Sequence, residues 1–135
     1  MKKILSLLFF VSALLAIGMP DNKYSNIILP SAQAYEYQQV QAMHILVPTE
    51  KEAILVRQEI LAGNNREEVF NNFMNAAKKY STCPSGKSGG ILGWFGRGDM
   101  VKEFESAAFN LPNGQVSEPV KTQFGWHLIY VISKK

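Results

Sequence analysis

Residues 81–90, near the middle of the chain, constrain the possible fold more than any other segment. They contain three glycines, one proline, four serine or threonine residues and Cys83, the only cysteine of the chain. Glycine and proline at this density destabilise the interior of helices and strands, so the segment is predicted to be a loop with at most one helical turn. Large apolar residues stand on both sides, from Tyr80 to Phe95. A cysteine, a glycine-rich loop and apolar side chains therefore meet in one short stretch.

The residues before this loop predict one strand and two helices. Residues 40–47 are predicted to be a strand, with the even-numbered side chains of Val40, Ala42, His44 and Leu46 on one face. Thr49 and Glu52 have the spacing of a capping box and open a helix over about residues 49–62. A second helix is predicted over residues 65–80, where apolar residues recur at helical spacing. The first half of the domain is therefore expected to be a strand followed by two helices.

The residues after the loop predict three more strands and one more helix. Residues 91–95 suit a short strand, and residues 100–109 suit a short amphipathic helix. A strong turn signal at residues 112–114 follows. Residues 116–121 and 125–132 are predicted to be two closing strands that pair antiparallel around the intervening residues. Strands and helices are thus mixed along the chain, which predicts a small α+β domain.

The first 34 residues have the pattern of an export signal. Two lysines precede an uncharged run over residues 4–19, which is shorter than the roughly 20 apolar residues of a transmembrane helix. The small-x-small pattern of residues 32–34 predicts cleavage before Tyr35. Residues 16–18 offer an earlier site of the same pattern, and an uncleaved anchor formed by residues 4–19 is the alternative. One domain is expected over residues 35–135.

The charge of this domain argues against two kinds of partner. Lys2, Lys3, Lys23 and Asp21 lie in the leader, which leaves 11 of the 14 basic and 10 of the 11 acidic residues in the domain. Because these charges are interspersed, neither nucleic acid nor an anionic membrane surface is an expected partner. A single cysteine excludes an internal disulfide. We expect a monomer that contacts a membrane only if the leader is not cleaved.

A few side chains could carry chemistry. His44 and His127 lie among apolar residues of predicted strands, so each could be a core histidine held by a hydrogen bond. With Cys83 they form the minimal pattern of a thiol hydrolase, although no hydrolase signature surrounds the cysteine. The same three residues could ligate a metal, but they lack the short-range pair spacing of metal sites. Residues 86–88 (Gly-Lys-Ser) do not complete a phosphate-binding loop, because Ser81 stands where that motif needs glycine.

Three segments, taken in order, resemble the parvulin family of peptidyl-prolyl cis/trans isomerases. They are Ala42-Met43-His44-Ile45-Leu46-Val47, then the stretch from Tyr80 to Phe95 with Met100 and Phe104, and finally Phe124-Gly125-Trp126-His127-Leu128-Ile129. The resemblance extends from about Gln39 to the C-terminus. It implies a four-stranded antiparallel sheet with three to four surrounding helices, isomerisation of X–Pro bonds in proline-containing polypeptides, and no cofactor.

The resemblance also implies roles for eight residues. Taken singly, the four apolar ones would be ordinary core residues, but together they match the proline pocket of the family: Leu92, Met100, Phe104 and Phe124. The polar side of the site would comprise His44, Cys83, Thr122 and His127. The two histidines would hold a hydrogen-bond network that orients the cysteine and the threonine, and direct proton transfer by them is not expected.

The implied reaction needs no covalent step. Amide resonance opposes rotation about a peptide bond with a barrier of about 18–20 kcal/mol. The twisted transition state loses that resonance, so its carbonyl is less dipolar than that of the planar amide. A dry apolar pocket that grips the proline ring would therefore bind the twisted state more strongly than the planar one.

The sequence also bears on the substrate. Phospho-specific parvulins have a basic cluster after the first strand, whereas residues 48–52 hold one lysine between two glutamates, so no preference for phosphoserine– or phosphothreonine–proline is expected. Ile91 replaces an acidic residue of many relatives, and the surrounding Gly-Gly-Ile-Leu-Gly-Trp resembles cyanobacterial and plastid-related members. The expected function is isomerisation in exported proteins, within the periplasm, the thylakoid lumen or outside the cell. The alternative is a non-catalytic, peptide-binding chaperone domain of the same fold.

Overall fold

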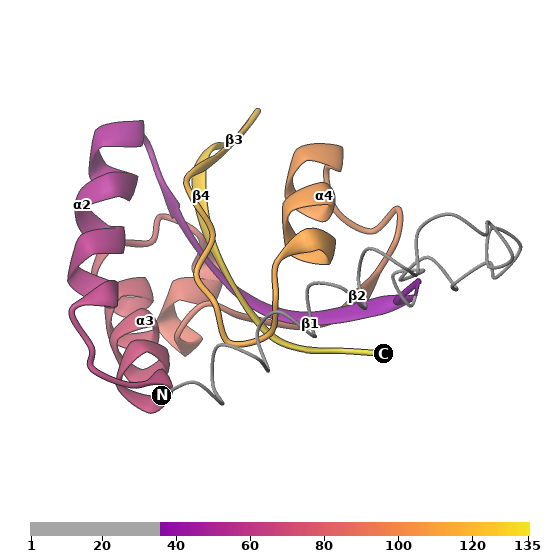
Figure 1. Cartoon of the computed structure of the whole chain (residues 1–135). Helices are drawn as coiled ribbons and strands as arrows, with labels where there is room; N and C mark the ends of the chain where they lie inside the picture. The colour runs from indigo at the N-terminus through magenta and orange to yellow at the C-terminus, as the bar shows by residue number, and fades with distance from the viewer. Residues whose placement is uncertain (1–35) are drawn as a thin grey trace, which may run out of the picture. The chain divides into compact units, whose positions relative to one another are not determined.

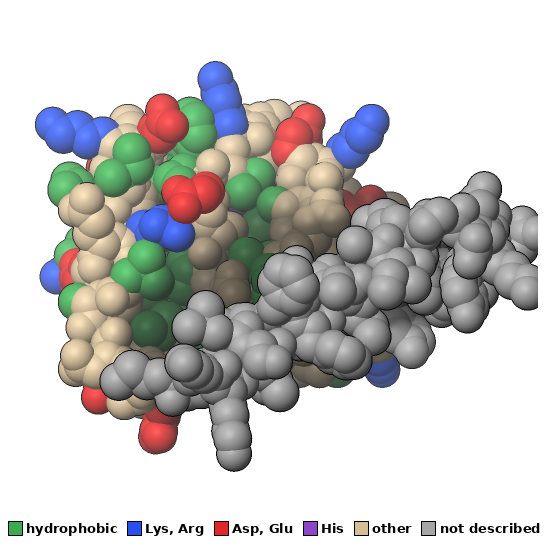
Figure 2. Space-filling view, in the orientation of Figure 1, with side chains coloured by type: hydrophobic (Ala, Val, Ile, Leu, Met, Phe, Trp, Pro, Cys, Tyr) green, Lys and Arg blue, Asp and Glu red, His purple; other side chains and the backbone are tan. Residues whose placement is uncertain are grey.

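The computed structural model of this chain describes residues 36–135 (Figure 1). The predicted leader, its cleavage sites and the alternative anchor lie outside the described residues. No helix within residues 36–135 is both long enough and apolar enough to cross a membrane. On the described part of the face shown in Figure 2, acidic, basic and apolar side chains are interspersed.

An antiparallel sheet of four strands forms the middle layer of the domain. The strands are β1 (Gln39–Val47), β2 (Ile91–Gly96), β3 (Val120–Thr122) and β4 (Gly125–Lys134), and their spatial order is β2-β1-β4-β3. Helices α2 (Glu50–Leu61) and α3 (Arg66–Tyr80) lie on one side of the sheet, and α4 (Lys102–Asn110) lies on the other (Figure 1). The predicted α+β fold with a four-stranded antiparallel sheet is confirmed.

Alternation along the two central strands gives each face of the sheet its own apolar core. Met43 and Ile45 of β1 pack with buried residues of α2 and α3. Val40 and Ala42, which point the other way, pack with residues of β2, β4 and α4. His44 shares this second face, because its ring contacts that of Phe104 on α4. The even-numbered face of β1 predicted from the sequence is therefore the face toward α4.

Side chains cap the N-termini of α2 and α3 at the predicted helix starts. Thr49 Oγ1 accepts a hydrogen bond from the backbone N–H of Glu52, and the Glu52 carboxylate accepts one from the backbone N–H of Thr49, which confirms the capping box. At α3 the Asn65 side chain caps the backbone N–H of Glu68. The Glu68 carboxylate accepts from the backbone N–H of Asn64, one residue before the cap, so α3 lacks the reciprocal hydrogen bond to Asn65 that would complete a capping box.

The glycine-rich loop is tied to β1 at both of its ends. It contains one short 3-10 helix, η1 (Pro84–Ser88), as the sequence suggested. The backbone N–H of Thr82 donates to the Leu46 carbonyl over 2.8 Å, and the backbone N–H of His44 donates to the Gly90 carbonyl over 2.9 Å. A Cβ atom at Gly90 would collide with the His44 carbonyl oxygen, and φ there is +82°, so only glycine allows this approach. These contacts fix the loop over the middle of the sheet.

Several element boundaries differ from the prediction by one or two residues, and the start of β3 differs by four. The predicted start of the strand over residues 116–121 is wrong, because β3 begins at Val120. Pro119 has no N–H to donate to the neighbouring strand, which interrupts the ladder, and upstream of it Val116 makes only an isolated bridge with Tyr130. The helix predicted over residues 100–109 begins two residues later and ends one residue later.

Candidate active site

Five polar side chains form one continuous series of hydrogen bonds on the α4 face of the sheet. Thr122 Oγ1 lies 2.8 Å from His127 Nε2, and His127 Nδ1 lies 3.1 Å from His44 Nδ1. His44 Nε2 lies 3.0 Å from Ser85 Oγ, whose hydroxyl donates to Cys83 Sγ over 3.3 Å. We call these five residues the polar network. It joins three strands and the glycine-rich loop.

Strand register brings the two histidines together. In the antiparallel pairing of β1 with β4, His127 lies opposite Leu46 and His44 lies opposite Ile129, so the histidines are diagonal neighbours on one face. Their rings are nearly parallel, with centroids 5.3 Å apart and an interplanar angle of 19°. The short β3–β4 hairpin then places Thr122 beside His127. Neither histidine could reach the other if β1 and β4 were not adjacent.

The polar network has a consistent pattern of donors and acceptors. Only one proton can lie between the two facing Nδ1 atoms, so one imidazole donates there and the other accepts. In one direction Thr122 donates to His127, His127 to His44, His44 to Ser85 and Ser85 to Cys83. The opposite direction needs the other tautomer of each ring and a thiol proton donated by Cys83. Both directions require two neutral imidazoles.

Burial keeps the imidazoles neutral. His44 and His127 are only 6% and 5% exposed. Burial lowers the pKa of His44 to about 4, and repulsion from His127 contributes in the same direction. Burial also lowers the pKa of His127. At neutral pH the centre of the network therefore carries no charge, which the direct contact between two Nδ1 atoms requires.

An apolar surface adjoins the histidines. The ring of Phe104 meets both imidazoles edge to face, with centroids 5.7 Å from His44 and 5.2 Å from His127. Leu92 and Met100 are partly buried against the same apolar cluster as Phe104.

Phe124 differs from these residues because it is 63% exposed. Its backbone N–H donates to Thr122 Oγ1 over 3.2 Å, which fixes its position at the turn between β3 and β4. Of the four residues predicted to form the proline pocket, three thus border one buried cluster and the fourth lies at the surface beside the network.

The structure brings the four predicted polar residues, His44, Cys83, Thr122 and His127, into one network. Their catalytic roles stay predictions. Sequence reasoning missed Ser85, which links His44 to Cys83. Its only signal in the sequence is a side-chain hydroxyl in the loop, and three other serine or threonine residues of residues 81–90 carry the same signal.

Comparisons with known proteins show which family and which relatives this chain is similar to. Residues 44–133 match the family model described as rotamase, PPIC-type PPIase domain. The chain is 47% identical over 97 residues to the foldase protein PrsA of Geobacillus sp. (strain WCH70), which covers 71% of this chain and 33% of that relative. It is 41% identical over 100 residues to the chaperone SurA of Chromobacterium violaceum, covering 73% of this chain and 23% of SurA.

One solved structure is similar to this chain over nearly its whole length. NmPin, the parvulin of Nitrosopumilus maritimus, has a TM-score of 0.60 and 38% sequence identity, and the match covers 71% of this chain and 97% of NmPin. The chain spans about a third of the length of the PrsA relative and less of SurA. The matched segment is therefore one part of the longer relatives and nearly the whole of NmPin.

The two buried histidines predict a pH-dependent stability. In the unfolded chain histidine binds a proton near pH 6.5, whereas folded His44 resists protonation down to about pH 4. The unfolded state therefore binds more protons in this window, so the free energy of unfolding falls as pH falls from about 6.5 to about 4. His44 accounts for at most about 3 kcal/mol of this loss. Urea unfolding at several pH values measures it.

The matched control is the double variant His44→Gln/His127→Gln. Acidic groups such as Glu68, whose pKa is lowered by hydrogen bonds from Asn64 and Asn65, also lose stabilising interactions in acid, but they are present in both proteins. The difference in stability between wild type and double variant should therefore shrink between about pH 6.5 and about pH 4. A difference that stays constant over this range would contradict the assignment of two neutral histidines.

Proposed function

The chain belongs to the parvulin family of PPIC-type peptidyl-prolyl isomerase domains, and on this premise we propose that its domain catalyses cis/trans isomerisation of X–Pro peptide bonds. The observation that carries the proposal is the polar network lying against the ring of Phe104. It combines an uncharged polar wall with an apolar surface at one place. These are the two environments that a rotating proline amide requires.

The apolar side of the site would bind the proline ring. In this proposal Phe104 forms the base, Leu92 and Met100 form the sides, and exposed Phe124 closes over the ring. The neutral histidines leave this region without a charge that would favour the more dipolar planar amide. The twisted transition state is therefore bound more strongly than the ground state, which is the differential binding that accelerates a reaction.

The polar network would respond to the changing amide from its two ends. Cys83 and Thr122 terminate the network, and both would face the amide. When the network runs from Cys83 to Thr122, the threonine hydroxyl proton is not used by His127 and can be donated to the substrate. When it runs the other way, Cys83 accepts from Ser85. Ser85 acts as a positioning residue in both cases. No covalent bond to the substrate is needed.

The substrate would be an unmodified X–Pro segment of an exported protein. We propose no preference for phosphorylated substrates, because Glu50 and Glu52 flank Lys51 at the start of α2 and the Glu52 carboxylate caps that helix. Export is proposed from the leader pattern alone. Assistance to protein folding is supported by similarity to relatives named foldase and chaperone.

We expect residues 35–135 to accelerate isomerisation of X–Pro tetrapeptides, with no gain for a phosphoserine–proline peptide over its unmodified counterpart. The reason is the presence of both the apolar surface and the polar network. A protease-coupled assay of cis-to-trans isomerisation measures the rate. A folded domain without activity would refute the enzyme proposal and favour the alternative function, that of a peptide-binding chaperone.

A matched pair of exposed aromatic residues tests the pocket. Phe124→Ala should lower kcat/KM at least about fivefold, which corresponds to about 1 kcal/mol of lost apolar contact in the transition state. Trp94 is also exposed, at 41%, but lies on β2 away from the polar network, so Trp94→Ala should change kcat/KM less than about twofold. Equal effects of the two substitutions would refute the role of Phe124.

Substitution of the cysteine separates the isomerase from a thiol hydrolase. Cys83→Ser keeps a hydroxyl that can accept from Ser85, so isomerisation should persist, with kcat/KM reduced by about tenfold or less. A thiol hydrolase would lose all activity because its nucleophile is gone. The tetrapeptide assay measures the isomerisation rate of the variant, and binding of an X–Pro peptide shows that the variant is folded. Complete loss of turnover with intact binding would favour covalent chemistry.

The leader proposal predicts the N-terminus of the mature protein. Export followed by cleavage should give a protein that begins at Tyr35, whereas cleavage at the earlier site would give one that begins at Met19. An intact N-terminus recovered with the membrane fraction would identify residues 4–19 as an anchor. Intact-mass analysis of the protein purified from cell fractions distinguishes the three outcomes.

A further inference from the structure

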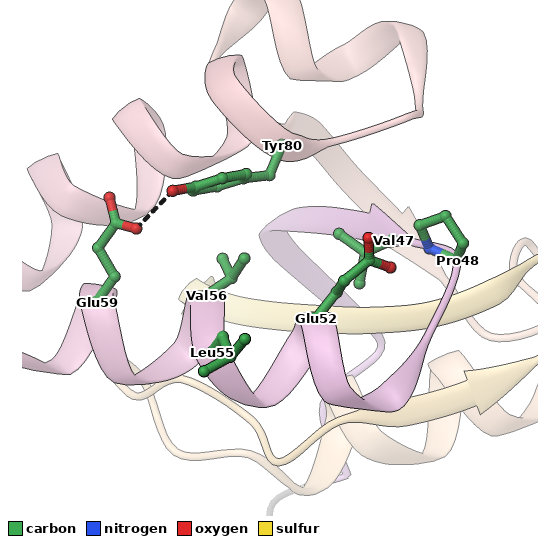
Figure 3. Close-up of a pocket in the computed structure, with 7 residues that line it drawn as sticks. All are labelled: Val47, Pro48, Glu52, Leu55, Val56, Glu59 and Tyr80. Carbon is green, nitrogen blue, oxygen red and sulfur yellow. Dashed lines mark hydrogen bonds between the residues drawn. The ribbon is translucent and has the colours of Figure 1, made fainter.

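A groove lies on the α2 and α3 side of the sheet, on the face opposite the candidate active site (Figure 3). Its volume is about 260 Å³, and it is lined by Val47, Pro48, Glu52, Leu55, Val56, Glu59 and Tyr80. These residues come from the end of β1, one face of α2 and the last residue of α3. A volume somewhat below the roughly 300–1,000 Å³ of small-molecule sites suits one large apolar side chain with the backbone that carries it.

The floor and one wall of the groove are apolar. Val47 and Val56 belong to the buried core, so they give the groove a rigid floor. Leu55 lies beside them and is 55% exposed, although it belongs to a well-formed helix. Exposed apolar surface next to an open hollow is characteristic of binding sites. The groove therefore offers a partner apolar contact that the described part of the chain does not fill.

The charge of the groove is acidic. None of its seven lining residues is lysine or arginine, and the two charged ones are Glu52 and Glu59. Tyr80 donates its hydroxyl to Glu59 Oε2 over 2.8 Å, as Figure 3 shows, and the other oxygen lies 3.8 Å from Lys79 Nζ. That ion pair is exposed and long, so a partner can replace it at little cost. The groove thus favours a basic partner.

The spacing of the two carboxylates specifies the partner further. Glu52 and Glu59 are seven residues apart on α2, with Leu55 between them, which corresponds to about 10 Å along the helix axis. A peptide in the extended polyproline II conformation advances about 3.1 Å per residue with three residues per turn, so basic side chains three positions apart lie on one edge, about 9 Å apart, and match both carboxylates. An apolar side chain between them would then enter the groove beside Leu55.

We propose that this groove binds an extended segment of another polypeptide in which one apolar residue lies between two basic residues three positions apart. Such binding is independent of proline and of isomerase activity. Along the chain, Val47 is three residues beyond His44, and Tyr80 is three residues before Cys83. A polypeptide held in the groove would therefore stay close to the candidate active site, which raises the effective concentration of its X–Pro bonds there.

The test uses the isotope-labelled full chain and a proline-free hexapeptide, Gly-Lys-Leu-Ser-Lys-Gly, titrated by NMR. We expect shifts of the backbone amides of Val47, Val56 and Tyr80, and no inhibition of X–Pro isomerisation by the peptide. The same peptide with both lysines replaced by glutamate should bind at least about tenfold more weakly, because like charges repel. Because the readout is binding, an inactive but folded protein would still test this proposal separately from the proposed function.

Two exposed positions on α2 provide a matched pair of variants. Leu55→Asp should weaken binding of the lysine peptide at least about tenfold, through loss of apolar contact and the cost of burying a carboxylate. Ile54 is 43% exposed on the same helix but does not line the groove, so Ile54→Asp should change the affinity less than about twofold. Glu59→Lys should weaken binding of the lysine peptide and strengthen binding of the glutamate peptide.

Each of five outcomes would overturn the proposal. Competition of the hexapeptide with an X–Pro substrate would place it in the active site. Equal affinity for the lysine and glutamate peptides would show that charge does not determine binding. Equal effects of the variants at positions 54 and 55 would show that apolar contact with Leu55 does not contribute to binding. Self-association abolished by Leu55→Asp would show that a second copy fills the groove. Binding only after removal of residues 1–34 would show that the N-terminal segment of the chain fills it.

Discussion

The direct hydrogen bond between His44 Nδ1 and His127 Nδ1 is the interaction on which the candidate site depends. It exists only because β1 and β4, the first and last strands of the domain, are neighbours at the centre of the sheet. It also requires both rings to be neutral, and burial lowers the pKa of each. The central strand pair therefore fixes both the geometry and the protonation of the site. Thr122 and Ser85 extend this pair to its two ends.

The glycine-rich loop adds the cysteine to this pair. Backbone hydrogen bonds from Thr82 to Leu46 and from His44 to Gly90 hold the loop against β1. Between these two ties the short η1 helix turns Ser85 toward His44. The loop thus has little freedom where Cys83 lies, although its composition alone would suggest mobility. A rigid site is consistent with catalysis by binding a twisted amide, since such a mechanism needs a preformed surface.

The two sides of the sheet carry different surfaces. The α4 side holds the polar network and the apolar ring of Phe104, whereas the α2 and α3 side holds the acidic groove. Both surfaces share β1 and the segment at the end of α3. A polypeptide that contacts both would be held by an apolar and basic segment while its X–Pro bond is processed. This combination would suit a domain that acts on unfolded chains of varied sequence.

The sequence alone predicted the fold class and four of the five residues of the polar network. Capping by Thr49, the spacing of apolar residues and the glycines of the loop are local signals, and the elements they predict form where expected. His44, Cys83, Thr122 and His127 followed from motif resemblance, and the structure brings them together. The early start predicted for β3 was wrong because a pattern of apolar residues does not register the missing N–H of Pro119.

Only the tertiary structure identified Ser85 as the link between His44 and Cys83, because four serine or threonine residues of the loop are equivalent in sequence. It also decided which residues of α2 face an open groove: Leu55 lines it and Ile54, the next residue, does not. The physical reason is the same in both cases. Helical and strand periods are local properties of the chain, whereas a hydrogen bond or a groove depends on the positions of segments far apart in sequence.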